Sequence, residues 1–355
     1  MVEGKMCDML NYEKEYGDYI LDVTSRLLAV DSPSGLTAKA ARFVQDELKS
    51  LGYASALTRK GSVTACLGGE EKGDGLLLEA HMDTLGAMVA EIKDNGRLRL
   101  TPIGGMNANN AEGENCRIVT KFDGTYEGTF QLVNASIHVN GDYNTTSRTY
   151  DTCEVVLDED VRSKEDVEEL GISQGDFVCF EPRTRITESG YIKSRFLDDK
   201  LSVGILLGYA KYLKEENITP KRAVYIHVTT YEEVGHGGSA GVPDGITEAI
   251  SVDMGCVGQG LACTERQVSI CAKDSGGPYD YEVVKGLMAA AKAMKADYAV
   301  DIYPHYGSDV EATLRAGYDV RHGLIGAGVY ASHGYERSHK DGALNTLKVL
   351  AGYTL

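Results

Sequence analysis

The chain has 355 residues, of which 43% are hydrophobic, and a formal net charge of −17 from 53 acidic and 36 basic residues. The acid excess argues against nucleic acid or an anionic membrane surface as a partner, because both bind basic patches. The eight cysteines form no Cys-x-x-Cys pair, and the sequence shows neither a signal-peptide pattern nor a span-length apolar stretch, so we expect a cytoplasmic protein.

The first part of the chain has the pattern of an α/β domain. Apolar residues recur at helical spacing up to Leu28, and a second helix is predicted over residues 38–51. Strands are predicted over residues 62–67 and 76–80. The second of these is mostly apolar, as a buried parallel strand should be.

From about residue 88 to residue 187 the pattern changes to β. This stretch is rich in Gly, Thr, Asn and Tyr, and its short alternating runs are typical of a small barrel or sandwich. The runs are residues 88–92, 98–102, 116–121, 129–133 and 176–180. A short helix near residues 163–170 is predicted to begin with Ser163 as its N-cap. We predict that residues 88–187 form an inserted, barrel-like β domain.

The α/β pattern returns after residue 187. Helices are predicted over residues 201–214, 281–294 and 310–316 and around 345–350. Strands are predicted over residues 223–230, 250–253 and 299–303. The sequence therefore predicts a mixed-sheet α/β catalytic domain made of residues 1–87 and 188–355, with the β domain inserted into it.

Possible metal ligands follow the ends of several predicted elements. In open α/β sheets, ligands bind beyond the carboxyl ends of the strands. We therefore expect one histidine and four or five carboxylates at one edge of one sheet. They would come from His81 and from six candidate carboxylates, Asp83, Asp198, Asp199, Glu232, Glu233 and Asp253.

So many carboxylates in one cleft require a cation, because like charges at close range raise each other's pKa. A pair of divalent ions is the natural solution, and mixed imidazole and carboxylate ligands suit Zn²⁺, with Co²⁺ or Mn²⁺ as alternatives. His333 is the best candidate for a second histidine ligand, and His339 is the fallback. Each motif alone has an ordinary structural explanation, such as helix capping or solvation. The prediction rests on their occurring together at element ends.

A competing motif, Gly237-Gly-Ser239-Ala-Gly241, matches the Gly-x-Ser-x-Gly pattern of serine hydrolases. That nucleophile needs a sharp turn between a strand and a helix. Here the preceding strand is predicted to end near Thr230, well before Ser239. We therefore favour metal-dependent chemistry.

Seven motifs together match one known family. They are Asp31-Ser-Pro-Ser-Gly35, His81-Met-Asp83, Leu100-Thr-Pro-Ile-Gly-Gly105, Arg195-Phe-Leu-Asp-Asp-Lys200, Glu232-Glu-Val-Gly235, Val252-Asp-Met-Gly255 and Ser332-His-Gly-Tyr-Glu336. Over nearly its whole length the chain resembles the tetrahedral aminopeptidases, metallopeptidase family forty-two. This family includes glutamyl aminopeptidases and proteins once called endoglucanase M.

The resemblance implies a site with two divalent ions, most simply Zn²⁺. Asp198 would bridge the ions. His81 and Asp253 would complete the ligands of one ion, and Glu233 and His333 those of the other.

The resemblance also implies the chemistry. Glu232 would be the general base toward a water that attacks the peptide bond, and Asp83 would hydrogen-bond His81 to fix its orientation. A cis peptide would join Asp198 and Asp199. The substrates would be peptides with a free N-terminus. The chain would form a homo-oligomer such as a tetrahedral dodecamer, with the inserted domain serving assembly and substrate access.

Some segments depart from the family pattern. They are Tyr330-Ala-Ser-His333-Gly, Gly307-Ser-Asp309-Val and His236-Gly-Gly-Ser. These differences leave the preferred N-terminal residue open. Two other functions also stay open: a metal-dependent amidase or deacylase acting on small acylated amino acids, and a non-catalytic metal-binding scaffold. Glu232 beside Glu233 argues against the scaffold, which has no use for a base next to a ligand.

Overall fold

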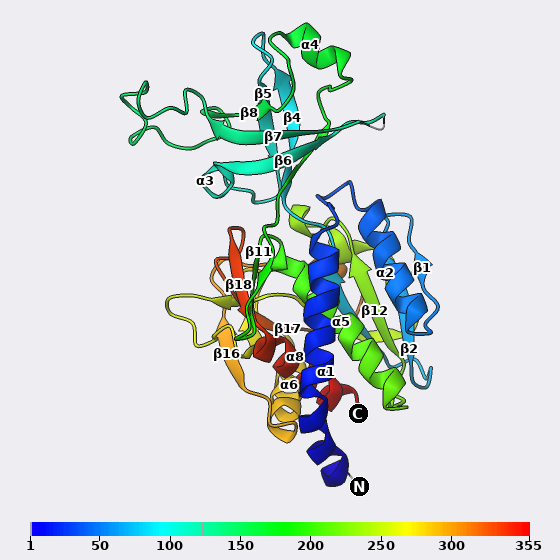
Figure 1. Ribbon diagram of the computed structural model, residues 1–355. Coiled ribbons are helices and arrows are strands. Elements are labelled where there is room, and N and C mark those ends of the chain that lie inside the picture. Colours follow the sequence, from blue (N-terminus) through cyan, green and yellow to red (C-terminus); the bar gives the residue numbers. More distant parts are fainter. Residues whose placement is uncertain (1, 123) are drawn as a thin grey trace.

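The computed structural model describes the backbone of residues 2–122 and 124–355 and the side chains of residues 15–122 and 124–355. Figure 1 shows a large α/β part below a smaller β part, with the two chain termini at the lower end. The mixed α/β fold and the barrel that the sequence predicts are both confirmed. The division into domains at residues 88 and 187 stays a prediction.

A mixed sheet of twelve strands forms the centre of the α/β part, and its main path runs β1-β2-β12-β3-β13-β17-β18-β11-β10. The strands are β1 (Ala56–Leu57), β2 (Val63–Gly68), β3 (Gly75–His81), β10 (Arg185–Ile186), β11 (Tyr191–Ser194), β12 (Val224–Thr229), β13 (Ile246–Val252), β14 (Gly255–Val257), β15 (Val268–Lys273), β16 (Tyr298–Ile302), β17 (Arg321–Tyr330) and β18 (Glu336–His339). Strands β12, β3, β13 and β17 are parallel neighbours, so their carboxyl ends meet at one edge.

Helices pack on this sheet and on one another. They are α1 (Val2–Leu28), α2 (Ala38–Ser50), α5 (Leu197–Glu215), α6 (Tyr281–Ala293), α7 (Asp309–Arg315) and α8 (Lys340–Thr354). Helix α5 is buried along most of its length because it lies between α1 and strand β3 (Figure 1). No helix in the described part of the chain is long and apolar enough to cross a membrane. The cytoplasmic location stays a prediction.

The β part is a closed barrel of six strands in the order β4-β5-β8-β7-β6-β9. Its elements are β4 (Gly86–Ile92), β5 (Leu98–Ile103), α3 (Ala108–Ala111), β6 (Glu114–Val119), β7 (Thr125–Leu132), β8 (Cys153–Leu157), α4 (Lys164–Glu169) and β9 (Phe177–Phe180). The predicted cap of α4 is confirmed: the Ser163 side chain accepts from the backbone N–H of Asp166, whose carboxylate accepts from the Ser163 backbone.

Ion pairs join the barrel to segments of the α/β part that lead to the metal-ligand candidates. Arg117 of β6 donates to both carboxylate oxygens of Asp31, at 2.8 and 2.6 Å. The buried carboxylate of Glu114 accepts from Arg183 at 2.7 Å and from Arg195 at 2.9 Å. Bidentate and charge-assisted contacts fix orientation as well as distance. The barrel is therefore anchored close to the start of α5.

Strand β17 is the main element that the sequence pattern did not predict. It contains Gly323, Gly326 and Gly328, and glycine weakens the usual strand signal. A Cβ at Gly326 would lie 1.4 Å from the carbonyl oxygen of Asp253, and one at Gly328 would lie 2.1 Å from that of Thr264. Glycine at these positions lets the neighbouring backbone approach β17. The same glycines obscured the strand in the sequence pattern.

Candidate metal centre and active site

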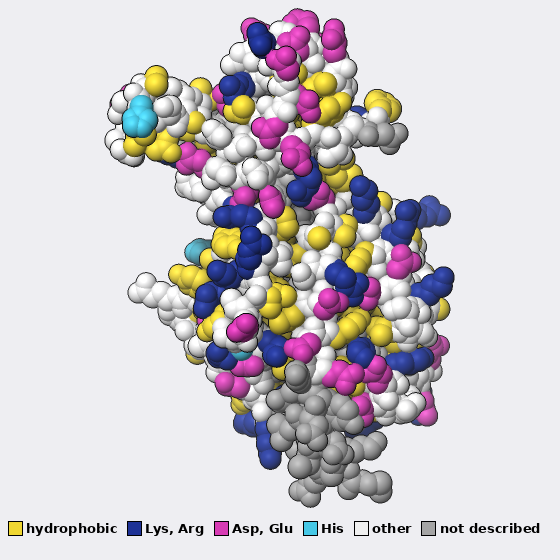
Figure 2. Space-filling model, viewed as in Figure 1, with side chains coloured by type: hydrophobic (Ala, Val, Ile, Leu, Met, Phe, Trp, Pro, Cys, Tyr) yellow, Lys and Arg dark blue, Asp and Glu magenta, His cyan; other side chains and the backbone are white. Residues whose placement is uncertain are grey.

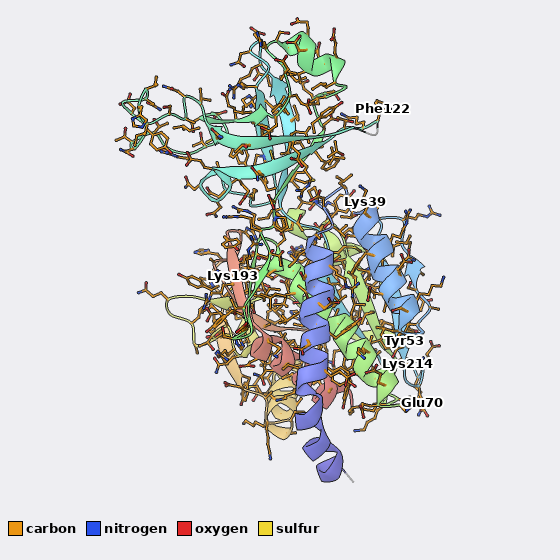
Figure 3. The ribbon with its side chains drawn as sticks, viewed as in Figure 1. Lys39, Tyr53, Glu70, Phe122, Lys193 and Lys214 are labelled. Carbon is orange, nitrogen blue, oxygen red and sulfur yellow. The ribbon has the colours of Figure 1, made fainter. Side chains whose placement is uncertain are left out.

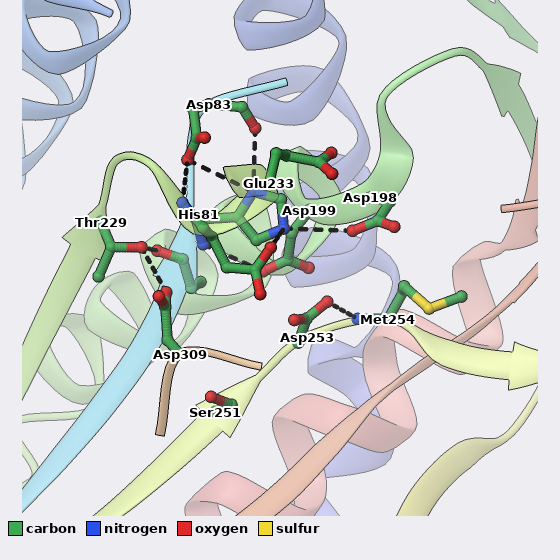
Figure 4. A network of polar contacts seen from close by, with 12 residues as sticks. His81, Asp83, Asp198, Asp199, Thr229, Glu233, Ser251, Asp253, Met254 and Asp309 are labelled. Atoms are coloured by element: carbon green, nitrogen blue, oxygen red, sulfur yellow. Dashed lines mark hydrogen bonds and ion pairs between the residues drawn. The ribbon is translucent and has the colours of Figure 1, made fainter. Parts of the chain in front are cut away.

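The predicted ligands converge where the parallel strands end (Figure 4). His81 is the last residue of β3, and Asp253 directly follows β13. Glu232 and Glu233 open a short 3₁₀ helix, η1 (Glu232–Val234), which follows β12. Asp198 lies in the first turn of α5, where its backbone departs from helical geometry. Four separate stretches of sequence therefore meet at one edge of the sheet.

Asp198 lies between two histidines. Its Oδ1 is 3.2 Å from His81 Nε2, and its Oδ2 is 3.5 Å from His333 Nε2. Glu233 Oε2 lies 3.6 Å from the same His333 nitrogen. His81, Asp198 and Glu233 can each offer one atom to a group whose members lie within 4.8 Å of one another. Each carboxylate oxygen of Asp198 thus faces a different imidazole.

Asp199 also belongs to this centre. It joins His81 and Asp253 in a second group of candidate ligand atoms within 4.8 Å. Its Oδ2 accepts from the backbone N–H of His81 at 3.2 Å, and its side chain is fully buried. The peptide bond between Asp198 and Asp199 is cis, as the family resemblance implies. The sequence pattern includes Asp199 among the candidate ligands, whereas the family resemblance assigns it to neither ion.

The orientation of His81 is fixed by the backbone of Asp83. The Nδ1 atom lies 2.9 Å from the Asp83 carbonyl oxygen and 3.7 Å from its carboxylate. A carbonyl oxygen only accepts, so Nδ1 carries the hydrogen and Nε2 is free to bind a metal. The Asp83 carboxylate accepts from Ser34 Oγ at 2.5 Å and from the backbone N–H of Glu232 at 3.2 Å. Asp83 therefore positions both a ligand candidate and the candidate base.

His333 is held by two residues that sequence reasoning had given no role. Its backbone N–H donates to Glu336 Oε1 at 3.1 Å, and its carbonyl accepts from Asn110 Nδ2 at 3.0 Å. The other oxygen of buried Glu336 accepts from the backbone N–H of Asp198 at 3.1 Å. Glu336 thus connects two ligand candidates, and Asn110 reaches His333 from the barrel. Only these contacts across large sequence separations could have identified them.

The fallback ligand and the serine motif have other surroundings. His339 accepts from the backbone N–H of Asp341 at 3.0 Å and caps α8, while its Nε2 lies 2.7 Å from the Ser189 carbonyl. Ser239 lies in a second 3₁₀ turn, η2 (Gly237–Ser239), and its hydroxyl donates to the His236 carbonyl at 2.8 Å. The structure brings His333, and not His339, next to Asp198.

The carboxyl groups of this centre have shifted pKa values. Burial first, and then neighbouring carboxylates, raise the pKa of Glu232, Glu233 and Asp199 well above the usual range. The same causes raise the pKa of Asp253 to about 7. Burial also acts on Asp198, but the adjacent imidazoles of His333 and His81 outweigh it and lower the pKa of that carboxyl.

Two buried oxygens of this centre, Asp199 Oδ1 and Glu233 Oε1, have no hydrogen-bond partner among the described residues. Buried polar atoms are rarely left unpaired without a reason. Divalent cations would pair with the free carboxylate oxygens and lower the raised carboxyl pKa values, and the two imidazoles would provide nitrogen ligands. The residues present therefore fit metal ions.

A cavity of about 500 Å³ opens beside the centre. The ligand candidates line one side of it, and the other sides include Gly235, His305, Ser308 and Arg315. This volume falls in the range of about 300–1,000 Å³ that small-ligand pockets occupy. The end of a peptide chain would fit within reach of Glu232.

We predict that Gly105→Ala weakens metal binding at His333. A Cβ at this position would lie 2.6 Å from His333 Nδ1 and 2.9 Å from its Cε1, so the ring must move. Displaced ligand support typically costs about 10–100-fold in metal affinity or activity. Calorimetric titration of metal-free protein with Zn²⁺ measures the loss. The control is Gly258→Ala, where an added Cβ meets nothing within 4 Å. Equal Zn²⁺ affinity in both variants would contradict this account of Gly105.

Comparison with known proteins gives a consistent result. Residues 61–349 match the M42 glutamyl aminopeptidase family. The chain is 42% identical over 333 residues to "Putative aminopeptidase YhfE" of Bacillus subtilis, covering 94% of this chain and 96% of that one.

Solved structures share the fold. The TET1 peptidase of Pyrococcus horikoshii, which can assemble into a tetrahedron or a large octahedral shell, superposes with a TM-score of 0.83 at 20% identity, over 95% of this chain and 99% of that one. Aminopeptidase APDkam598 of Desulfurococcus kamchatkensis gives 0.83 at 21% identity, over 97% and 95%. With the family match and the close bacterial relative, these findings identify this chain as a member of the M42 glutamyl aminopeptidase family and a peptide hydrolase.

Proposed function

We propose that this aminopeptidase works with two divalent metal ions and uses Glu232 as its general base. The observation that carries the proposal is Asp198, whose two carboxylate oxygens face two different imidazoles at 3.2 and 3.5 Å. On this proposal Asp198 would help to hold both ions, His81 and Asp253 would hold one, and Glu233 and His333 would hold the other. Mixed nitrogen and oxygen ligands favour Zn²⁺, and Co²⁺ or Mn²⁺ also suit them.

The ions supply electrophilic chemistry. When bound, two such ions lower the pKa of a water molecule and stabilise the negative charge that develops on the scissile carbonyl oxygen. The protein's part is to fix the ligands and to move protons. The hydrogen bonds around His81, Asp83 and Glu336 serve the first task, since they orient ligand candidates before any substrate arrives.

Glu232 serves the second task. Its Oε2 lies 3.7 Å from His81 Nε2, which places the carboxylate beside the centre, and its backbone is fixed by Asp83. Burial raises the pKa of the Glu232 carboxyl above its usual range, which makes it a stronger proton acceptor than a solvated glutamate. Glu232 takes a proton from the attacking water and returns it to the leaving amine. Asp83 acts only by positioning Glu232 and His81.

The acidic surroundings also support selection of a free N-terminus. An ammonium or amine group at the end of a peptide is attracted by the carboxylates around the cavity, whereas an internal amide carries no such charge. The competing proposal is an amidase or deacylase acting on small acylated amino acids, which needs the same ions but not the free amine. A non-catalytic scaffold would bind metal without turnover.

A panel of aminoacyl chromogenic substrates, each free or N-acetylated, tests the function directly. We expect hydrolysis of free substrates only, loss of turnover after complete metal removal with a chelator, and recovery on adding Zn²⁺, Co²⁺ or Mn²⁺. Preference for N-acetylated substrates would favour the deacylase. Full activity in verified metal-free protein would refute the metal mechanism, and metal binding without turnover on any substrate would favour the scaffold.

We predict that Glu232→Gln retains its metal but loses most of its turnover. The amide keeps the size of the side chain but cannot accept the proton, and general acid–base catalysis is worth about 10²–10⁴ in rate. Steady-state kinetics and metal analysis of the same preparation give both quantities. Glu188→Gln, at an exposed position, is the control for the substitution itself. Turnover close to that of the wild type would remove Glu232 as the base.

We further propose that the barrel mediates self-assembly and controls access to the cavity. Phe122, at the tip of the β6–β7 hairpin (Figure 3), is 89% exposed, and Val139 on the long loop after β7 is 75% exposed. Such exposed apolar side chains commonly mark contact surfaces. Acidic side chains gather instead at the outer end of the barrel around α4 (Figure 2). The assembly described for the Pyrococcus horikoshii relative supports this proposal.

Sedimentation analysis of the full chain tests assembly. We expect a particle of many chains, such as a dodecamer, and a shift to smaller species in the double variant Phe122→Asp, Val139→Asp, because charge disfavours burial at an interface. The exposed control is Glu70→Asp, which preserves charge on the α/β part. A single-chain mass for the wild type at micromolar concentration would contradict the proposal.

A further inference from the structure

The loop that carries Glu232 and Glu233 has little apolar anchoring of its own. No residue of η1 is buried as a whole, and Val234 is 43% exposed. Tyr231 and Gly235, on either side of η1, have φ angles of 69° and 85°, in the left-handed region. A loop with so little apolar burial depends on polar contacts to keep its side chains in place.

Lys60, on the turn between β1 and β2, contacts both ends of this loop. Its backbone carbonyl accepts from Thr230 Oγ1 at 3.1 Å, just before η1. Its ammonium donates to the carbonyl oxygens of His236 and Gly237 and to Ser239 Oγ, the last two at 3.1 Å, just after η1. A single residue thus spans the segment 230–239.

The turn that presents Lys60 is itself well fixed. The Thr58 backbone N–H donates to the Ser62 carbonyl at 2.9 Å, and the Gly61 backbone N–H donates to the Thr58 carbonyl at 3.1 Å. The Ser62 N–H donates to Thr58 Oγ1 at 3.0 Å. Because three hydrogen bonds close the turn, the backbone that carries Lys60 is well fixed.

The ammonium of Lys60 fits its surroundings. Three acceptors match the three donors of a lysine ammonium. It also lies 5.8 Å from the centroid of the Tyr231 ring, which stacks on His236 with centroids 5.0 Å apart. Charge-assisted hydrogen bonds of this kind are stronger than neutral ones.

Two other anchors complete the support. The Asp83 carboxylate accepts from the Glu232 backbone at 3.2 Å, and the buried Asp309 carboxylate accepts from the Gly238 backbone at 2.7 Å and from the Thr229 hydroxyl. These anchors act from the sheet edge and from α7. Lys60 acts from a third direction, on a hairpin outside the metal centre.

We propose that Lys60 is a positioning residue that fixes the loop 230–239 and thereby aims Glu232 at the attacking water. This inference rests on the proposed role of Glu232. Lys60 does not itself line the cavity, and its ammonium binds backbone and a hydroxyl rather than a ligand side chain, so it acts through the loop. Loss of its ammonium should slow the proton transfer step more than it weakens substrate binding.

The test compares Lys60→Met with Lys60→Arg and with Arg59→Met, all in the full chain with saturating Zn²⁺. Arg59 is exposed on the same turn and provides the matched loss of charge. We expect Lys60→Met to lower kcat by about tenfold or more, within the range for residues that support catalytic groups, with KM changed much less. Lys60→Arg should recover most of kcat, and Arg59→Met should match the wild type.

Amide hydrogen exchange, read by mass spectrometry, gives a measure independent of turnover. Peptides covering residues 231–239 should exchange faster in Lys60→Met, while peptides of the barrel should not change. Unaltered exchange in the loop, or a wild-type kcat in Lys60→Met, would overturn the proposal. If the wild type cleaves no peptide at all, the proposed function fails, and the exchange data still decide whether Lys60 holds the loop.

Discussion

The concentration of buried carboxylates at one sheet edge is the constraint to which the rest of the structure responds. Glu232, Glu233, Asp199 and Asp253 all have raised pKa values because burial and mutual repulsion disfavour their charge. Such a cluster of carboxylates would destabilise the fold unless positive charge neutralised it, since buried unpaired charge is strongly unfavourable. Two imidazoles supply part of the compensation, and divalent cations would supply the remainder. The carboxylates repel one another because the parallel strands bring them together at their carboxyl ends.

The hydrogen bonds that hold this centre come from several segments that are far apart in the sequence. Ser34 holds the Asp83 carboxylate, Glu336 holds the backbones of Asp198 and His333, and Asn110 reaches His333 from the barrel. Most of these contacts join residues far apart in the sequence. Because Asn110 of the barrel donates to the His333 carbonyl, displacement of the barrel would move His333.

These long-range contacts explain what the sequence could and could not predict. Strands β3 and β12 have apolar runs that end at His81 and before Glu232, so local pattern sufficed for half of the centre. The glycines of β17 hid the strand beside Asp253. His333 follows no periodic element, so it could be named only as a candidate for the second histidine, and its pairing with Glu233 came from the family resemblance. Glu336 and Lys60 carry no local signal at all, because their roles exist only once the chain has folded.

Glu232 and Glu233 show why a rigid loop matters more here than a rigid strand. Consecutive side chains of a strand point to opposite faces, whereas a 3₁₀ turn of three residues separates them by about 120°. Glu232 Oε2 therefore lies 3.7 Å from His81 Nε2 while Glu233 Oε2 lies 3.6 Å from His333 Nε2, so neighbours in sequence face different histidines. A small rotation of η1 would move both carboxylates at once. On our proposal the polar anchors at both ends of the loop oppose that rotation, in place of the apolar packing that the loop lacks around η1.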